Sequence, residues 1–399
     1  MANSGNKLFS RMDRSVFGEW WWTVDRRLLM AFSALIIFGV VLVSAASPPV
    51  AMRIGLNEYH FIFRHIIMLL PAVVMMIGLS MLSPRNLWRF CSLMLIGTIG
   101  ALVFVILFGV EIKGAQRWIH LPGFSLQPSE FAKPAFAVSA AWLIARQKEN
   151  KSFKGGLLSA GLFLMIITLL LLQPDLGMTF VVGCIYGAIL FLAGMPLWIV
   201  GGMSVLGVVG IIGSYFAFSH VQSRIDRFLD PASGDSFQVQ KSLEAFQNGG
   251  LFGTGPGQGS VKLGLPDAHA DFIFAVSGEE LGFLVTFLLV AIFMFILFRG
   301  FNRMMETQNM FVVLAMGGLL TMFGVQAFVH MGSSLSMIPT KGMTLPFISY
   351  GGSSLLSVSI AAGALLCLTR QNVRKNVARG STVKRSKAKS VSLPVQGEL

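Results

Sequence analysis

Long apolar stretches alternate with short polar ones along almost the whole of this chain of 399 residues. Ten stretches are long enough to cross a bilayer as helices. We place them at 29–47, 61–82, 89–110, 131–146, 156–173, 176–194, 197–218, 271–298, 310–331 and 347–368. The fourth is the weakest, because it is short and contains Lys133 and Pro134. The pattern predicts an all-α integral membrane protein with about ten transmembrane helices.

Composition agrees with this fold class. The chain is 54% hydrophobic, its mean hydropathy is +0.71, and only 12% of its residues are charged. That charged share is about half the usual value for a soluble domain, so the chain cannot supply the polar shell that a soluble protein of this length needs. The three cysteines lie far apart within apolar runs, and neither they nor the six histidines show a metal-binding spacing. We therefore expect no disulfide framework.

The distribution of charge predicts the orientation. With the N-terminus in the cytoplasm, most of the 31 Lys and Arg residues fall on the cytoplasmic side and most of the 18 acids fall outside. The basic excess then indicates loops that face an anionic leaflet and excludes nucleic acid as a partner. We divide the chain into a cytoplasmic segment 1–28, a transmembrane domain 29–369 with outer loops 111–130, 219–270 and 332–346, and a basic cytoplasmic tail 370–399. We expect that tail to be disordered.

Candidate polar groups occur in and near the outer loops, and most of them have a structural alternative. Arg117 and Lys133 are cations of the kind that bind phosphate oxygens. Lys133 lies three residues after Glu130, so these two side chains could instead pair on one helical face. Asp175, in "QPDLGM", is typical of a helix N-cap. The glycine-rich stretch 253–259 follows no predicted strand and lacks a P-loop Lys, which argues against nucleotide binding.

Two further segments combine charge with membrane edges. Lys341 lies between two proline-containing turns, an irregular backbone that is tolerated where it lines a cavity; alternatively, its side chain reaches the interface. Asp271, in "LPDAHADFIFAVSGEELG", precedes a long apolar run and could simply cap a helix. Glu279 and Glu280 would lie roughly 12–14 Å deeper along one continuous helix. Buried acids at that depth are expensive, so we expect them to pair with buried polar groups.

Five motifs taken together resemble the SEDS family (shape, elongation, division and sporulation proteins). They are "GAQRWI", "QPSEFAK", "QPDLGM", "LPDAHADFIFAVSGEELG" and "PTKGMTLPFISYGGSSL", and they occur in the family's order through nearly all of residues 29–370. The segment around Lys341 is similar to the division branch, FtsW, with the elongation branch, RodA, as the nearest alternative. Asp267 and Ala270 stand where family members often have Glu and Thr, but neither departure touches Asp271.

The resemblance implies a peptidoglycan glycosyltransferase of ten transmembrane helices in the cytoplasmic (inner) membrane, with both termini in the cytoplasm. Such proteins polymerise lipid II into glycan strands at the outer face of the membrane, here during septal wall synthesis. The implied partners are lipid II, a cognate class B penicillin-binding transpeptidase and other membrane proteins of the division complex. The family's essential Asp matches Asp271, and further family positions match Arg117, Lys133 and Lys341.

The implied reaction gives these residues candidate roles. We expect Asp271 to deprotonate the 4-hydroxyl of the acceptor sugar. Cations, or a divalent metal such as Mg²⁺ or Mn²⁺, would stabilise the undecaprenyl pyrophosphate leaving group. The residues expected to bind substrate are Arg117, Glu130, Lys133, His269, Lys341 and Ser353. Two other functions remain open: a lipid II flippase that uses intramembrane Lys133, Glu279 and Glu280, and a scaffold that only recruits the transpeptidase.

Overall fold

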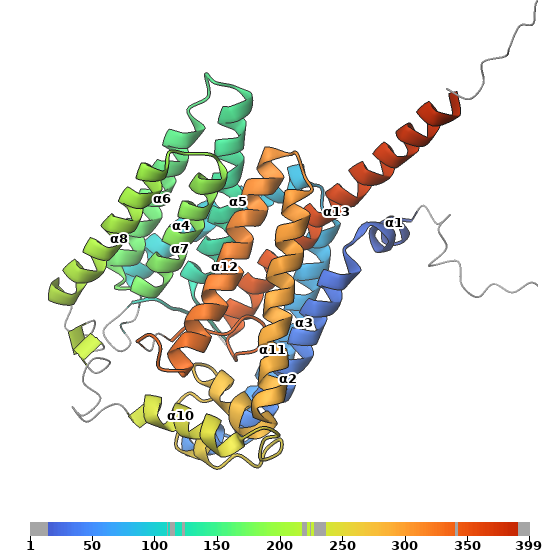
Figure 1. Ribbon diagram of the computed structural model, residues 1–399. Helices are drawn as coiled ribbons and strands as arrows, with labels where there is room; N and C mark the ends of the chain where they lie inside the picture. The colour runs from blue at the N-terminus through green and yellow to red at the C-terminus, as the bar shows by residue number, and fades with distance from the viewer. Residues whose placement is uncertain are drawn as a thin grey trace, which may run out of the picture.

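The computed structural model describes residues 15–109, 111, 116–121, 124–217, 222–223, 225–226, 237–339 and 342–389. Ten long helices dominate this part of the chain (Figure 1). They are α2 (Arg26–Arg53), α3 (His60–Met81), α4 (Pro84–Phe108), α5 (Pro128–Glu149), α6 (Gly155–Leu172), α7 (Leu176–Leu192), α8 (Leu197–Ala217), α11 (Ile273–Met305), α12 (Met310–Ser334) and α13 (Gly352–Lys389). Each overlaps one predicted stretch, in the predicted order.

Seven of the helices in the described ranges are long and apolar enough to span a membrane: α2, α3, α4, α6, α11, α12 and the part of α13 up to Arg370. Helix α7 has the same composition but only 17 residues. Helix α5 carries Glu130, Lys133 and Arg146, which matches its weak signal in the sequence. The chain is an all-α, multi-pass membrane protein, as its hydropathy predicts.

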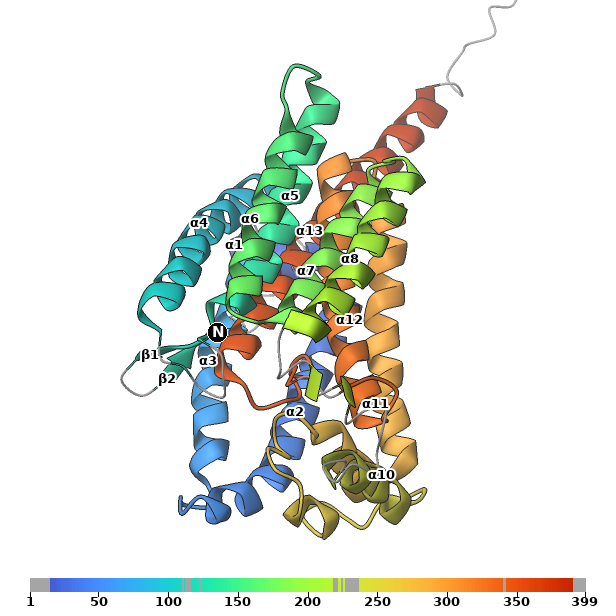
Figure 2. The ribbon, with the colours of Figure 1, turned by 90° about the vertical axis from the view of Figure 1, so that its left-hand side faces the viewer.

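Short elements decorate the two ends of the bundle. Helix α1 (Val16–Thr23) lies at the same end as the C-terminal part of α13 (Figure 1). Toward the opposite end lie helix α10 (Phe237–Gly249), the 3₁₀ turn η1 (Val261–Leu263) and an antiparallel hairpin. The hairpin joins β1 (Ile119–Leu121) to β2 (Phe124–Leu126) and follows α4 (Figure 2).

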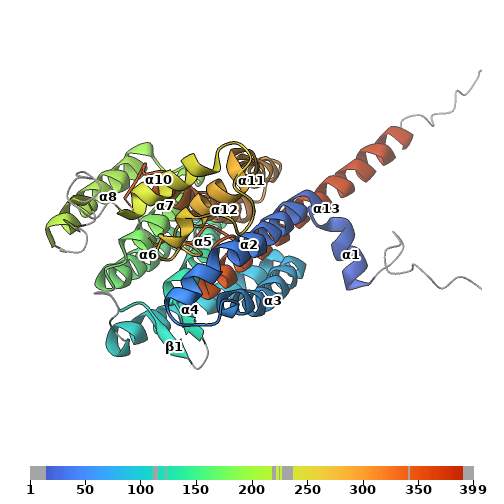
Figure 3. The same ribbon diagram turned by 90° about the horizontal axis from the view of Figure 1, so that it is seen from below.

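Helices α5, α12 and α13 form the interior of the bundle. In the membrane-spanning part of α13, 89% of residues are buried, against 22% in α3. Helix α5 is buried over most of its length and is rich in alanine, which lets neighbouring backbones approach closely. Seen along the bundle, α5 and α12 lie between α8 and α3 (Figure 3). Apolar residues of helices at the periphery of the bundle, such as Leu70 of α3 and Phe104 of α4, remain exposed, as expected of side chains that face lipid.

The stretch 271–298 is not the single continuous span that its apolar pattern predicts. Gly282 has φ 76° and ψ 177°, a backbone conformation outside the helical region. Ser277 Oγ and Thr286 Oγ1 lie 3.2 Å apart, whereas nine residues of continuous helix would separate them by about 13 Å. The chain therefore turns back at Gly282, and residues 283–305 form the membrane-spanning segment. The expectation that Glu279 and Glu280 lie deeper in the membrane than Asp271 is wrong.

Glu279 and Glu280 instead organise residues 237–272, which we call the outer cap. The Glu279 carboxylate accepts hydrogen bonds from the backbone N–H groups of Ser260 (2.7 Å), Val261 (2.8 Å) and Lys262 (3.2 Å). Glu280 forms an ion pair with Lys262 and accepts a bond from the N–H of Gly257 (2.9 Å). The expected pairing of both acids with buried polar groups is confirmed, and the glycine-rich stretch supplies one of those partners, the N–H of Gly257.

Helix α13 extends beyond the bundle as far as Lys389 (Figure 1). Up to that residue the basic tail is helical where we expected disorder, and residues 390–399 lie outside the described ranges. Lys and Arg, which are common in this segment, have high helix propensity.

Candidate active site

Asp271 lies at the end of the outer cap, just before the first turn of α11, and is half-buried. Its backbone N–H donates to the carbonyl oxygen of Asp267 at 2.9 Å, which closes the turn before the helix. The N-cap of α11 is Phe272, and no side chain makes a capping hydrogen bond there. Asp271 is therefore not the helix cap that the sequence left open as an alternative.

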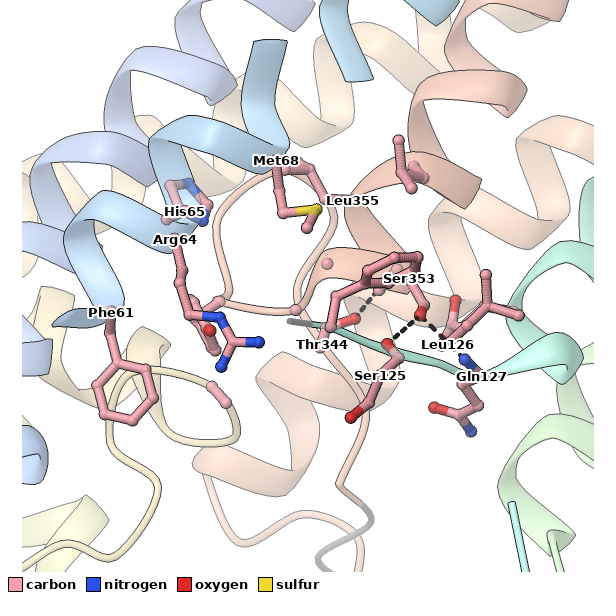
Figure 4. Close-up of a pocket in the computed structure, with 18 of the residues that line it drawn as sticks. Phe61, Arg64, His65, Met68, Ser125, Leu126, Gln127, Thr344, Ser353 and Leu355 are labelled. Carbon is pink, nitrogen blue, oxygen red and sulfur yellow. Dashed lines mark hydrogen bonds between the residues drawn. The ribbon is translucent and has the colours of Figure 1, made fainter. Parts of the chain in front are cut away.

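The Asp271 side chain lines a cavity of about 410 Å³. Helix α3 contributes Arg64 to the wall (Figure 4). Helix α5 contributes Glu130. The remaining lining comes mainly from the hairpin, from the end of the outer cap and from residues 342–356. Segments from four distant parts of the sequence thus meet around one carboxylate.

Four of the predicted site residues meet in this cavity: Asp271, Glu130, His269 and Ser353. Ser353 Oγ donates to the carbonyl oxygen of Ser125 at 3.2 Å and accepts the N–H of Gln127 at 3.0 Å, so it joins α13 to the hairpin (Figure 4). Lys341 lies outside the described residues, although its neighbour Gly342 lines the cavity.

Arg117 does not line the cavity but ties the hairpin to the turn between α6 and α7. Its guanidinium donates to the carbonyl oxygens of Gln173 (3.1 Å) and Pro174, and it approaches the Asp175 carboxylate at 3.9 Å. Asp175 also accepts the N–H of Met178 at 3.3 Å. The interpretation of Asp175 as an N-cap is confirmed.

Lys133 is also absent from the cavity wall, with only 1% of its surface exposed. Its ammonium lies 2.8 Å from Glu130 Oε2 and donates to Gln326 Oε1 at 2.8 Å. The i,i+3 pairing that the sequence offered as the structural alternative is confirmed. An ammonium this deeply buried is stable only with such partners.

Arg64 is a cavity residue that the sequence analysis missed. It is the one Lys or Arg side chain among the described residues of the wall, and its guanidinium points into the cavity (Figure 4). The signal available in the sequence was a single arginine within the second apolar stretch, in "HFIFRH". A lone intramembrane charge is a functional-site hypothesis by default.

Three aromatic rings form the wall beside Asp271. The Phe61 ring lies 4.5 Å from His269 and 5.1 Å from Tyr350, and the His269 and Tyr350 rings are 5.0 Å apart. Burial lowers the pKa of His269 to about 4, although the Asp267 charge opposes this shift. Because His269 is neutral at pH 7, the positive charge of Arg64 is the one Lys or Arg charge in the described part of the wall.

A carboxylate, a guanidinium and an aromatic surface in one cavity suit a phosphorylated sugar. The carboxylate can accept a proton from a hydroxyl, and the guanidinium can bind phosphate oxygens in a forked geometry. The described residues contain no group of three or more His, Cys, Asp or Glu side chains arranged to hold a metal ion.

Comparison with known proteins gives consistent matches. The family model FtsW–RodA–SpoVE, described as "Cell cycle protein", matches residues 26–374. The probable peptidoglycan glycosyltransferase FtsW of Caulobacter vibrioides is 40% identical over 372 residues, covering 93% of this chain and 95% of that protein. The probable peptidoglycan glycosyltransferase FtsW of Escherichia coli O157:H7 is 35% identical over 370 residues, covering 90% of this chain and 89% of its own length.

Solved structures match over a similar range. A chain from a peptidoglycan synthase complex that coordinates polymerisation and crosslinking superposes with a TM-score of 0.72 at 26% identity. The rod shape determining protein RodA of Thermus thermophilus superposes with a TM-score of 0.63, also at 26% identity. Both alignments cover 88% of this chain and 98% of the matched chain.

Proposed function

Because this chain belongs to the family of cell cycle proteins that includes FtsW, RodA and SpoVE, we propose that this peptidoglycan glycosyltransferase polymerises lipid II for septal wall synthesis. The relatives named FtsW are 35–40% identical to the chain, and the RodA structure is 26% identical. This difference favours the division branch over the elongation branch.

Asp271 is the general base of the proposed reaction. Its carboxylate takes the proton of the acceptor's 4-hydroxyl as that oxygen attacks the anomeric carbon of the donor. The glycosidic bond forms while the bond to undecaprenyl pyrophosphate breaks, and the pyrophosphate leaves with the electron pair. One displacement without a covalent intermediate inverts the anomeric centre, which converts an α-linked donor into a β-1,4 linkage. The observation that carries this proposal is the position of Asp271 in the wall of the cavity.

Arg64 stabilises the negative charge that develops on the leaving pyrophosphate. A guanidinium held on a helix needs little reorganisation during the reaction, and its forked donors match phosphate oxygens. The rings of Phe61, His269 and Tyr350 offer an apolar face for a sugar beside it. A divalent cation such as Mg²⁺ or Mn²⁺, bound mainly through the pyrophosphate oxygens, would add to this stabilisation.

The two ends of the bundle support the proposed orientation and partners. Helix α1 and the basic C-terminal part of α13 lie at one end, which we assign to the cytoplasm by the positive-inside rule (Figure 1). The outer cap lies at the opposite end, on the side where lipid II is polymerised. The similar chain from a peptidoglycan synthase complex supports a class B transpeptidase as the partner, within a larger division complex.

A flippase role is less well supported, because the acids and lysine expected to serve it are already engaged. Glu279 and Glu280 hold the outer cap, and Lys133 is enclosed by Glu130 and Gln326. Glu279, Glu280 and Lys133 do not line the cavity. Lipid II movement across liposomes without polymer would nevertheless favour a flippase, and transpeptidase recruitment without either activity would favour a scaffold.

Polymerisation of lipid II by the purified protein together with its transpeptidase tests the role of Asp271. We expect Asp271→Asn to lower the rate at least about 100-fold, because general base catalysis commonly contributes that much. The matched control is Asp267→Asn, four residues earlier in the same turn and absent from the cavity wall, which should retain most activity. A folded Asp271→Asn protein that forms glycan at the wild-type rate would overturn the proposal.

A further inference from the structure

A buried polar network runs between α5 and α12 and reaches the cavity wall at Glu130. Lys133, Glu130 and Gln326 are exposed by only 1%, 4% and 1%. Lys133 joins the other two, with 2.8 Å to Glu130 Oε2 and 2.8 Å to Gln326 Oε1. Polar groups this deep are costly unless they are bonded, so the network strongly constrains the side chains that form it.

The ammonium of Lys133 dictates which way the Gln326 amide faces. An ammonium has donors and no acceptor, so the amide oxygen must point toward Lys133 and the amide nitrogen away from it. That nitrogen donates to the carbonyl oxygen of Thr344 (3.1 Å), to Thr344 Oγ1 (3.2 Å) and to Ser354 Oγ (3.3 Å). Thr344 and Ser354 both line the cavity.

From Thr344 the contacts continue to the residues just before Asp271. The N–H of Leu345 donates to Ser349 Oγ at 2.8 Å, and Ser349 Oγ donates to the carbonyl oxygen of Ala270 at 2.7 Å. The N–H of Tyr350 donates to the carbonyl oxygen of His269 at 2.9 Å. Residues 342–350 are thus held by Gln326 on one side and hold the backbone before Asp271 on the other.

We propose that Gln326 is a positioning residue for glycosyl transfer, because its oriented amide sets residues 342–350 against Asp271. It contacts no substrate. The Lys133–Glu130 pair fixes the amide, the amide fixes Thr344, and the segment that contains Thr344 fixes the carboxylate. This inference rests on the proposed function of Asp271, since a displacement of about 1 Å matters only for a group that takes part in the reaction.

Two substitutions of Gln326 change the hydrogen bonds of the side chain while they keep its volume nearly constant. Gln326→Met keeps the length of the side chain and removes every hydrogen bond. Gln326→Glu keeps an acceptor for Lys133 and replaces the donors to Thr344 with an acceptor. We expect both to lower kcat about 10- to 100-fold with less than a threefold change in KM. The control on the same helix is Thr321→Val, whose hydroxyl bonds only to the carbonyl oxygen of Gly317 among the contacts described.

A readout that loss of folded protein cannot mimic is the acid-side midpoint of the kcat–pH profile. Unfolding lowers the amplitude of that profile, whereas a displaced Asp271 carboxylate titrates at a different pH and moves the midpoint. The described part of the cavity wall also contains other titratable groups: Arg64, His65, Glu130, His269 and Tyr350. None of these residues is substituted in the variants. We expect a shifted midpoint in both Gln326 variants and an unchanged one in Thr321→Val.

A double substitution tests the route through Thr344. If Gln326 acts through this residue, Thr344→Val lowers kcat alone and adds little to the loss in Gln326→Met. Additive losses, or a Gln326→Met protein with wild-type kcat and pH midpoint, would overturn the inference. Asp271→Asn measured in the same assay separates the two proposals: if it is active the proposed function fails, and if it is inactive while the Gln326 variants are normal only the positioning role fails.

Discussion

Arg117, which the sequence analysis expected to bind phosphate, and Arg64, which it missed, have different surroundings in the folded protein. The Arg117 guanidinium is occupied by the carbonyl oxygens of Gln173 and Pro174 and lies near Asp175. The Arg64 guanidinium points into the cavity that Asp271 lines. The local alternatives proposed for Asp175 and Lys133 were correct because those contacts lie within one helical turn. The position of Arg64 in the cavity depends on segments more than 200 residues away, including the one that carries Asp271, and no local pattern reports such a contact.

Substitution of the two arginines should therefore give different results. We expect Arg64→Gln to lower kcat/KM for lipid II polymerisation about 100-fold, because it removes a preorganised cation from the leaving group, and Arg64→Lys to recover part of the loss. Arg117→Gln should lower the melting temperature while the folded fraction keeps most of its kcat. Equal activity of wild type and Arg64→Gln would contradict the proposed role.

At the scale of elements, one glycine in α11 allows the chain to reverse within an apolar run that otherwise predicts a single span. The run from Asp271 onward has the length and composition of a single span, and periodicity alone does not reveal the reversal at Gly282. A Cβ atom at Gly282 would lie 2.2 Å from the backbone nitrogen of Gly253, and φ there is +76°. Close packing of the outer cap against the turn therefore requires glycine.

Gly282→Ala should loosen the outer cap. We expect a loss of about 2 kcal/mol or more in the free energy of unfolding, from backbone strain and the contact with Gly253, with faster proteolysis within residues 250–264. Thermal unfolding and limited proteolysis measure the two effects. Gly97→Ala in α4 is the control, because its Cβ would meet nothing within 4 Å and alanine favours a helix. Equal unfolding of both variants would show that the turn tolerates a side chain.

At the scale of the whole molecule, α2 and α11 are joined at both ends of the bundle. At the end near α1, the Asp25 carboxylate lies 2.9 Å from Arg299 and 2.8 Å from Arg303. At the end near the outer cap, Lys262 of η1 links the two helices, because it donates to the carbonyl oxygen of Ala45 at 2.8 Å and forms an ion pair with Glu280. Helix α11, which follows Asp271, is therefore held by polar contacts at both of its ends.

Asp25→Asn should destabilise the protein by about 1–3 kcal/mol at pH 7, since it leaves two partly exposed arginines without their carboxylate. Burial raises the pKa of Asp25, but hydrogen bonds from Arg303 and Arg299 outweigh it and hold that pKa below its ordinary value. Asp25 is then ionised in both folded and unfolded chains above about pH 5, so the difference should stay constant up to pH 8. The difference in the free energy of unfolding should shrink only as the pH falls below about 4 and through the pKa of Asp25 in the folded protein.

Thermal unfolding at several pH values measures this difference. Glu149→Gln removes the exposed ion pair with Arg146, at 3.1 Å, and should cost less than about 1 kcal/mol. An Asp25→Asn protein no less stable than Glu149→Gln would show that the junction contributes little.

By itself, the sequence determined the membrane class, the order of ten helices and the approximate limits of most of them, because a spanning helix is specified by local hydropathy over about 20 residues. Its motifs, read as a resemblance, also singled out Asp271. The tertiary structure alone decided which charges share the cavity, which way the Gln326 amide faces and where α11 turns back. Those properties depend on contacts between distant segments, such as Arg64, Glu130 and Asp271 around one cavity, and such contacts exist only once the helices have packed.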